Sequence, residues 1–72
     1  MGEEKKMEKV DRLQKKLEHW VEYNKELAES FRKAAREAEE IGLVDVSRRL
    51  KEAAKSMDES SALLKEAMKE LS

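Results

Sequence analysis

The chain has 72 residues, of which 46% are charged and 39% are apolar, and its net charge is −1. This length allows a single domain, and the absence of cysteine together with a single histidine excludes disulfides and Cys- or His-rich metal sites. The near-balance of charge argues against nucleic acid as the main partner. Such a small domain needs very regular helix packing or oligomerisation to be stable.

Long helices are indicated by the excess of Glu, Lys, Arg, Leu and Ala and by the absence of proline. No apolar run reaches the roughly 18 residues that span a bilayer. The first residues also lack the apolar segment of a signal peptide. We therefore expect no membrane partner, no targeting signal, and a cytoplasmic or recombinant protein.

The first predicted helix spans about residues 3–41. From Val10 at heptad position a and Leu13 at d, apolar residues recur at steps of three and four. The stripe contains Val10, Leu13, Leu17, Trp20, Asn24, Leu27, Phe31, Ala34, Ala38 and Ile41. A second row at Val21, Ala28 and Ala35 widens this face beyond a two-stranded seam, which favours a bundle.

Gly42 is the predicted end of this helix, because glycine adopts the left-handed conformation of a helix C-terminus at low cost. Leu43 would then fold back on Ala38 as the apolar contact that accompanies such an end. Asp45 follows at the N-cap or in the first turn of the next helix, where its carboxylate accepts backbone N–H groups or opposes the dipole. The turn is expected at residues 42–45.

The second predicted helix spans about residues 46–71 and has the same heptad spacing. Its stripe contains Val46, Leu50, Ala53, Met57, Ser60, Leu64, Ala67 and Leu71, flanked by Ala54, Ser61 and Met68. Antiparallel folding about the turn sets Ala38 near Leu50. The same register sets Phe31 near Met57. The sequence thus predicts an all-α fold, an antiparallel hairpin of two long amphipathic helices that assembles as a four-helix bundle.

Residues near the N-terminus lack a partner within this hairpin, because the second helix ends opposite about residue 16. Met7, Val10 and Leu13 would be uncovered, and a layer of two helices encloses no core. We therefore expect a homo-oligomer or a target protein to cover this surface. Two alternatives stay open: the first turns fray, or the first helix breaks near His19 and folds back to make three helices.

Candidate chemical groups do not converge on one site. His19, Glu22 and Tyr23 lie on neighbouring turns, yet a catalytic or metal site needs more than one imidazole and one carboxylate. We therefore expect neither an enzyme nor a cofactor or metal. An acidic ridge is either a solvated face or complementary to a basic partner. Its members are Glu18, Glu22, Glu26 and Glu29.

Polar residues interrupt both stripes at one level. Asn24 occupies an a position, where a buried Asn commonly fixes register or oligomeric state. Ser60 and Ser61 lie almost opposite it, with Ser56 in the same stretch. Because serine is an indifferent helix former, these serines either hydrogen-bond Asn24 within the bundle or leave room for a partner.

Residues 17–24 read Leu-Glu-His-Trp-Val-Glu-Tyr-Asn. They resemble the start of a family of small helical prokaryotic proteins of uncharacterised function, which carries a His-Trp-x-Glu-His-Asn pattern with another His four residues on. The similarity continues through Phe31 and the Glu-Ala-Glu-Glu-Ile-Gly-Leu turn, over residues 13–71. Tyr23 and Leu27 stand where that pattern has histidines, so a metal function implied by the resemblance is not expected. We interpret the chain as a natural helical scaffold whose surface was rewritten to bind another protein.

Two functions are compatible with these features. The first is a designed or engineered protein-binding module, with enzyme inhibition as one form, in which aromatic anchors among small polar residues make the binding hot spot. Its expected protein-binding residues are His19, Trp20, Glu22, Tyr23, Glu26, Leu27, Ser56, Ser60 and Leu63. The second is a natural-type structural hairpin that homodimerises through the same stripe.

Overall fold

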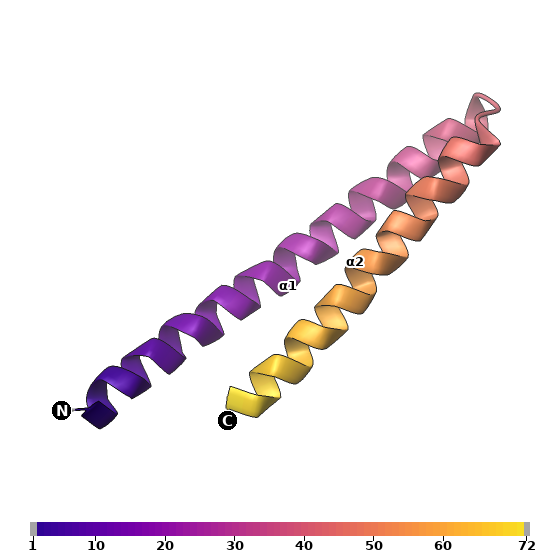
Figure 1. The fold of residues 1–72 in the computed structure, drawn as a ribbon. Coiled ribbons are helices and arrows are strands. Elements are labelled where there is room, and N and C mark those ends of the chain that lie inside the picture. Colours follow the sequence, from indigo (N-terminus) through magenta and orange to yellow (C-terminus); the bar gives the residue numbers. More distant parts are fainter. Residues whose placement is uncertain (1, 72) are drawn as a thin grey trace.

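The computed structural model describes the backbone of residues 2–71 and the side chains of residues 5–71. Two helices, α1 (Gly2–Glu40) and α2 (Val44–Leu71), run antiparallel and form a rod with extents of 61 × 14 × 11 Å (Figure 1). The described residues contain no strand. The predicted all-α hairpin is confirmed, and α1 is continuous through His19 rather than broken there.

Gly42 ends α1 as predicted, with a φ of +81°. Its N–H donates to the Glu39 carbonyl at 3.0 Å, and the Leu43 N–H donates to the Ala38 carbonyl at 2.8 Å. This pair of bonds is the Schellman motif, which satisfies carbonyls that a helix end leaves without partners. α2 begins immediately, because the Leu43 carbonyl already accepts from the Ser47 N–H at 3.0 Å.

The connection is therefore shorter than the predicted turn at 42–45. α2 starts at Val44 instead of about residue 46, and α1 ends at Glu40 instead of residue 41. Asp45 lies in the first turn of α2, one of the two places expected for it. Its carboxylate opposes the helix dipole there and pairs with Arg48 at 3.0 Å.

Small side chains make up the contact between the helices. The buried apolar residues among those described are Leu17, Ala28, Ala35, Ala38 and Ala54. In heptad terms, α1 turns its a and e positions toward α2, not the predicted a and d positions. The reason is size: alanine at e lets the backbones approach, whereas Trp20 at d is too large for a two-helix seam and remains 45% exposed.

Ion pairs between the helices place the register close to the predicted one. Arg32 pairs with Asp58, and Glu39 pairs with Lys51. Each of these pairs lies one position along from a contact that the two stripes predict. The heptad spacing therefore predicts correctly which residues of the two helices lie level with each other. It predicts incorrectly how α1 is rotated about its own axis.

α1 extends beyond the last residue of α2, as the register predicts (Figure 1). Within this extension Met7 and Leu13 are 68% and 44% exposed, and Val10 is half-buried. Leu17 is the first described side chain that is buried. We call residues 5–16 the overhang. It is helical throughout, so its apolar side chains are presented on a regular surface.

Candidate interaction surface

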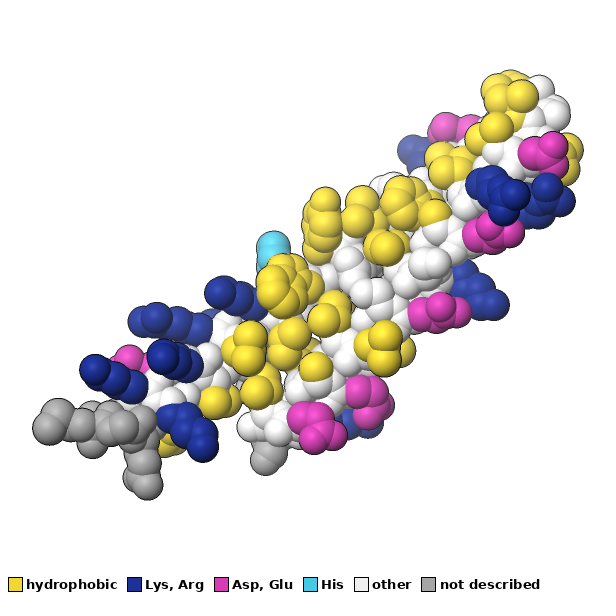
Figure 2. All heavy atoms as spheres, viewed as in Figure 1, with side chains coloured by type: hydrophobic (Ala, Val, Ile, Leu, Met, Phe, Trp, Pro, Cys, Tyr) yellow, Lys and Arg dark blue, Asp and Glu magenta, His cyan; other side chains and the backbone are white. Residues whose placement is uncertain are grey.

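The hairpin has two broad faces of opposite character. Steps of about 100° per residue place the d and b positions of α1 on opposite sides of the seam. The apolar face consists of Leu13, Trp20, Tyr23, Leu27 and Ala34 of α1 with Val46, Ala53, Met57, Leu63 and Leu64 of α2. The charged face consists of Lys25, Arg32 and Glu39 of α1 with Lys51, Asp58 and Lys65 of α2. Figure 2 shows hydrophobic side chains running along both helices on the first of these faces.

Polar contacts bridge the helices across the charged face. Arg32 forms an ion pair with Asp58. The Glu39 carboxylate accepts hydrogen bonds from Lys51 Nζ and, at 2.9 Å, from Ser47 Oγ. The Lys51 ammonium, and then the Ser47 hydroxyl, lower the pKa of Glu39 below its usual value. Ser47 is only 2% exposed, so this bond also satisfies a buried hydroxyl.

The apolar face, by contrast, keeps large side chains exposed. Trp20 is 45% exposed and Tyr23 is 53% exposed, while Leu63 across the hairpin is 71% exposed. Trp20 and Tyr23 lie on the same side of α1, because residues three apart are neighbours on a helix surface. Large aromatic side chains carry much of the energy of binding surfaces. This face is therefore the candidate interaction surface.

The structure brings most of the predicted binding residues to this face. Trp20, Tyr23 and Leu27 lie on it from α1, with Leu27 half-buried. From α2, Leu63 lies on its outer part. Ser56 is exposed and shares that outer part, since it precedes Leu63 by one heptad. These residues form one surface that crosses both helices.

A polar contact lies beneath the same surface. The Asn24 amide Nδ2 donates to Ser60 Oγ at 3.2 Å, which confirms one of the two roles considered for this serine. Its neighbour Ser61 has a buried Oγ with no hydrogen-bond partner. The Asn24–Ser60 bond links the helices at one register, so Ser60 contributes to the hairpin as well as to the surface.

His19 and the two glutamates of the predicted set lie elsewhere. His19 and Glu26 occupy the c positions, which point along the outer edge of α1 away from α2. Glu22 lines an open groove with Val21, Lys65 and Met68. That groove lies on the side of the charged face. The predicted acidic ridge is therefore divided, and only Glu26 lies close enough to form a rim of the apolar face.

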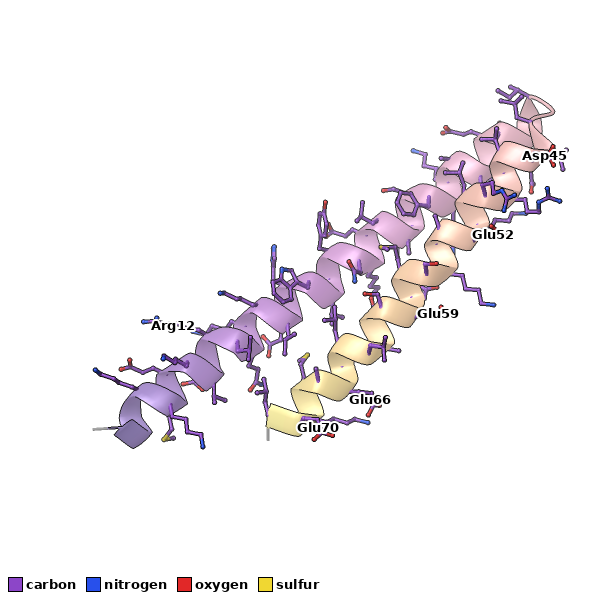
Figure 3. The ribbon with its side chains drawn as sticks, in the orientation of Figure 1. Arg12, Asp45, Glu52, Glu59, Glu66 and Glu70 are labelled. Atoms are coloured by element: carbon purple, nitrogen blue, oxygen red, sulfur yellow. The ribbon has the colours of Figure 1, made fainter. Side chains whose placement is uncertain are left out.

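A second acidic row was not recognised from the sequence. Asp45, Glu52, Glu59 and Glu66 project from the outer edge of α2, whereas Arg12 projects from α1 on the other side (Figure 3). Their spacing of seven residues is the signal that identifies the row. Glu52 and Glu66 pair with basic residues of their own helix. These carboxylates therefore form a solvated edge and not a cluster aimed at a ligand.

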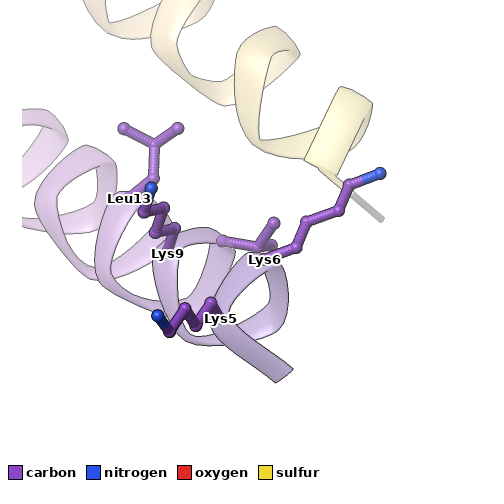
Figure 4. A pocket seen from close by; sticks show the side chains of 5 residues that line it. Lys5, Lys6, Lys9 and Leu13 are labelled. Carbon is purple, nitrogen blue, oxygen red and sulfur yellow. The ribbon is translucent and has the colours of Figure 1, made fainter. Parts of the chain in front are cut away.

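The overhang forms an open depression on the described surface. Its volume is about 410 Å³, and it is lined by Lys5, Lys6, Lys9, Val10 and Leu13 (Figure 4). Two apolar side chains and three lysines therefore share its lining. An occupant would need apolar groups for the first and negative charge for the second.

Other kinds of site are not seen in the described part of the chain. Residues 2–71 contain no helix that is both long enough and apolar enough to cross a membrane. The side chains described contain no group of three or more His, Asp or Glu placed to hold a metal ion.

Comparison with known proteins identifies one family. Residues 13–71 match the model described as "Domain of unknown function (DUF8180)". No curated protein and no solved structure matches the chain. The His-Trp-x-Glu-His-Asn pattern and the rewriting of the surface stay predictions.

Proposed function

Because the chain belongs to the DUF8180 family, a domain of unknown function, we propose a function from its surface: it is a protein-binding module that uses the apolar face. It is not an enzyme. Binding requires only a shaped surface with anchors, whereas catalysis requires converging acid, base or nucleophilic groups. The exposed aromatic residues Trp20 and Tyr23 carry this proposal.

The amount of exposed surface supports the proposal. The chain exposes 6040 Å², whereas a compact monomer of 8.4 kDa would expose about 4,600 Å². The excess of about 1,400 Å² is larger than the roughly 800 Å² that each partner buries in a standard protein interface. The exposed area of this elongated chain is therefore large enough to accommodate a standard interface on the apolar face.

The composition of the face also suits binding. Trp20 and Tyr23 are residue types enriched at hot spots. Ser60, which accepts a hydrogen bond from Asn24 beside Tyr23, is a small neighbour that lets a partner approach. Glu26 at the rim favours a partner with a basic residue nearby. An enzyme inhibitor is one form that such a module takes, with the target enzyme presenting the complementary pocket.

Photo-crosslinking in cells tests the proposal. A photoreactive amino acid replaces Tyr23 or Leu63 on the apolar face, and Glu29 on the far side of α1 serves as the matched control. We expect positions 23 and 63 to crosslink to the same protein, identified by mass spectrometry, whether another protein or a second copy. Purified partner should then bind the Trp20→Ala variant more weakly. Equal labelling from position 29, or no crosslinks from positions 23 and 63, would contradict the proposal.

A further inference from the structure

We infer that a second copy of this chain covers the apolar face, with the two hairpins antiparallel to each other. The inference rests on the proposed function, since it names the partner of the same surface. The overhang, the distribution of charge beside the face and the exposed area are the observations that carry it.

Charge changes sign along the flank of α1 that borders the apolar face. The c and g positions make up this flank, and they point outward beside the exposed d residues. In the overhang these positions are all basic: Lys5, Lys9, Arg12 and Lys16. Toward the turn they are mostly acidic, with Glu26, Glu37 and Glu40 against a single basic residue, Lys33. One flank therefore carries both halves of a complementary pair.

This asymmetry distinguishes the two ways in which identical hairpins pack face to face. A parallel pair would place the basic overhang of one copy against the basic overhang of the other, which is unfavourable. An antiparallel pair places each overhang against the acidic part of the partner. Such a contact is isologous, which means that both copies use the same surface. The contact between a basic overhang and an acidic flank therefore forms twice, once on each side of a single two-fold axis.

The aromatic residues mark where the axis would lie. With Trp20 and Tyr23 at the centre, each aromatic pair packs on the same pair of the other copy. Lys16 of one copy then lies beside Glu26 of the other, because both are displaced by similar distances from the centre. The overhang depression at Val10 and Leu13 faces the apolar surface of the partner beyond Leu27, which supplies the occupant that the depression lacks within one chain.

The exposed area agrees with this arrangement. A contact confined to the paired part of the hairpin would leave the overhang uncovered. An antiparallel contact covers the overhang as well, and so draws on more of the excess of about 1,400 Å² per chain. A foreign partner would also have to supply both an apolar surface and acidic groups in matching positions, which the second copy already has.

Single-cysteine variants test the orientation, because the chain contains no cysteine of its own. Lys16→Cys and Glu26→Cys are each oxidised mildly alone, and then as an equimolar mixture. Both positions are exposed, so the hairpin should fold in each variant, as circular dichroism will show. We expect disulfide-linked dimers only in the mixture. Each variant has a single cysteine, so every disulfide that forms joins two chains.

Charge exchange gives a second test with a solution readout. Lys16→Glu should weaken self-association by about tenfold, since like charges then meet at both symmetric contacts. Adding Glu26→Lys in the same chain should restore it. Sedimentation equilibrium measures both effects on the full chain.

Two results would overturn the inference. Disulfide dimers of either single variant alone would show a parallel arrangement. A mass of one chain at all concentrations, with no disulfide dimers in the mixture, would show that no second copy binds. In that second case, crosslinks from position 23 to another protein would leave the proposed function standing, so the two failures are distinguishable.

Discussion

The two faces of the hairpin use the same helices in different ways. On the charged face, side chains of α1 reach α2 and are satisfied there, as Arg32 with Asp58 and Glu39 with Lys51 show. On the apolar face, side chains of comparable size remain exposed, among them Trp20 and Tyr23. The comparison teaches that the ion pairs that align the helices lie on one face, whereas the large side chains of the proposed binding surface lie on the other; the Asn24–Ser60 bond is a contact that belongs to both.

This division has an energetic consequence. Exposed ion pairs contribute little to stability, typically up to about 1 kcal/mol each. Burial of alanine at the seam removes little apolar area from water compared with burial of larger side chains. The hairpin alone therefore has few sources of stability, and covering the apolar face is the largest source that remains available.

The largest expected effect is the loss of stability on Phe31→Ala, which shows whether a partner covers the apolar face. Phe31 borders the face and is half-buried within one chain. If a partner completes its burial, Phe31→Ala should destabilise the fold by about 3–5 kcal/mol, the usual cost of removing a well-packed aromatic. Urea unfolding at high protein concentration measures this loss. A loss below about 1 kcal/mol would show that the face stays exposed, while Glu29→Ala on the far side of α1 should change stability by no more than about 0.5 kcal/mol.

Tyr23→Ala sharpens the distinction between binding and folding. Tyr23 is 53% exposed, so its removal should change the stability of the hairpin by less than about 1 kcal/mol. Affinity for the partner should fall by about 2 kcal/mol or more, as expected for an aromatic anchor. Thermal unfolding at low concentration and a binding titration measure the two quantities separately. Unfolding of the variant would instead place Tyr23 in the structural core.

Much of the fold follows from the sequence, because it depends on local patterns. The heptad spacing gives two helices, Gly42 gives the stop, and Asn24 opposite the serines gives a polar contact. The rotation of α1 does not follow, since a stripe of a and d positions with a second row at e does not say which flank faces inward. The size difference between Ala28 and Trp20 decides it, and this becomes visible only when both helices are placed.

The surface is less predictable than the fold for the same reason. Trp20, Tyr23 and Leu27 were expected together, and they lie together because spacings of three and four on one helix fix their direction. Glu22 was expected with them, yet it lines a groove on the other side. The Glu39 contacts with Ser47 and Lys51 were not anticipated, because they depend on how closely two helices approach beside a tight turn.

Gly42→Ala tests how much the left-handed conformation of the turn contributes to the stability of the hairpin. A φ of +81° disfavours any residue with a Cβ, and a Cβ built at Gly42 meets nothing within 4 Å. The cost is therefore conformational alone, about 1–2 kcal/mol. Thermal unfolding should show this loss, and Gly42→Asn should lose less, because asparagine tolerates the left-handed region. Equal losses in the two variants would contradict a purely conformational origin.

The smallest expected effect is the change with pH in the stability that Glu39 contributes on the charged face. Because the pKa of Glu39 is lowered in the folded state, its ionised form stabilises the fold at pH values above its usual 4.5. This contribution is lost as pH falls through the lowered pKa, where the folded and the unfolded state are both protonated. Glu39→Gln should therefore be slightly less stable than the wild type at neutral pH, and the difference should shrink on acidification. Urea unfolding over a pH series measures it, with Glu29→Gln correcting for the general loss of one negative charge. A difference that persists unchanged at acid pH would show that the amide disturbs packing at Ser47 instead, and that charge does not hold the helices together beside the turn.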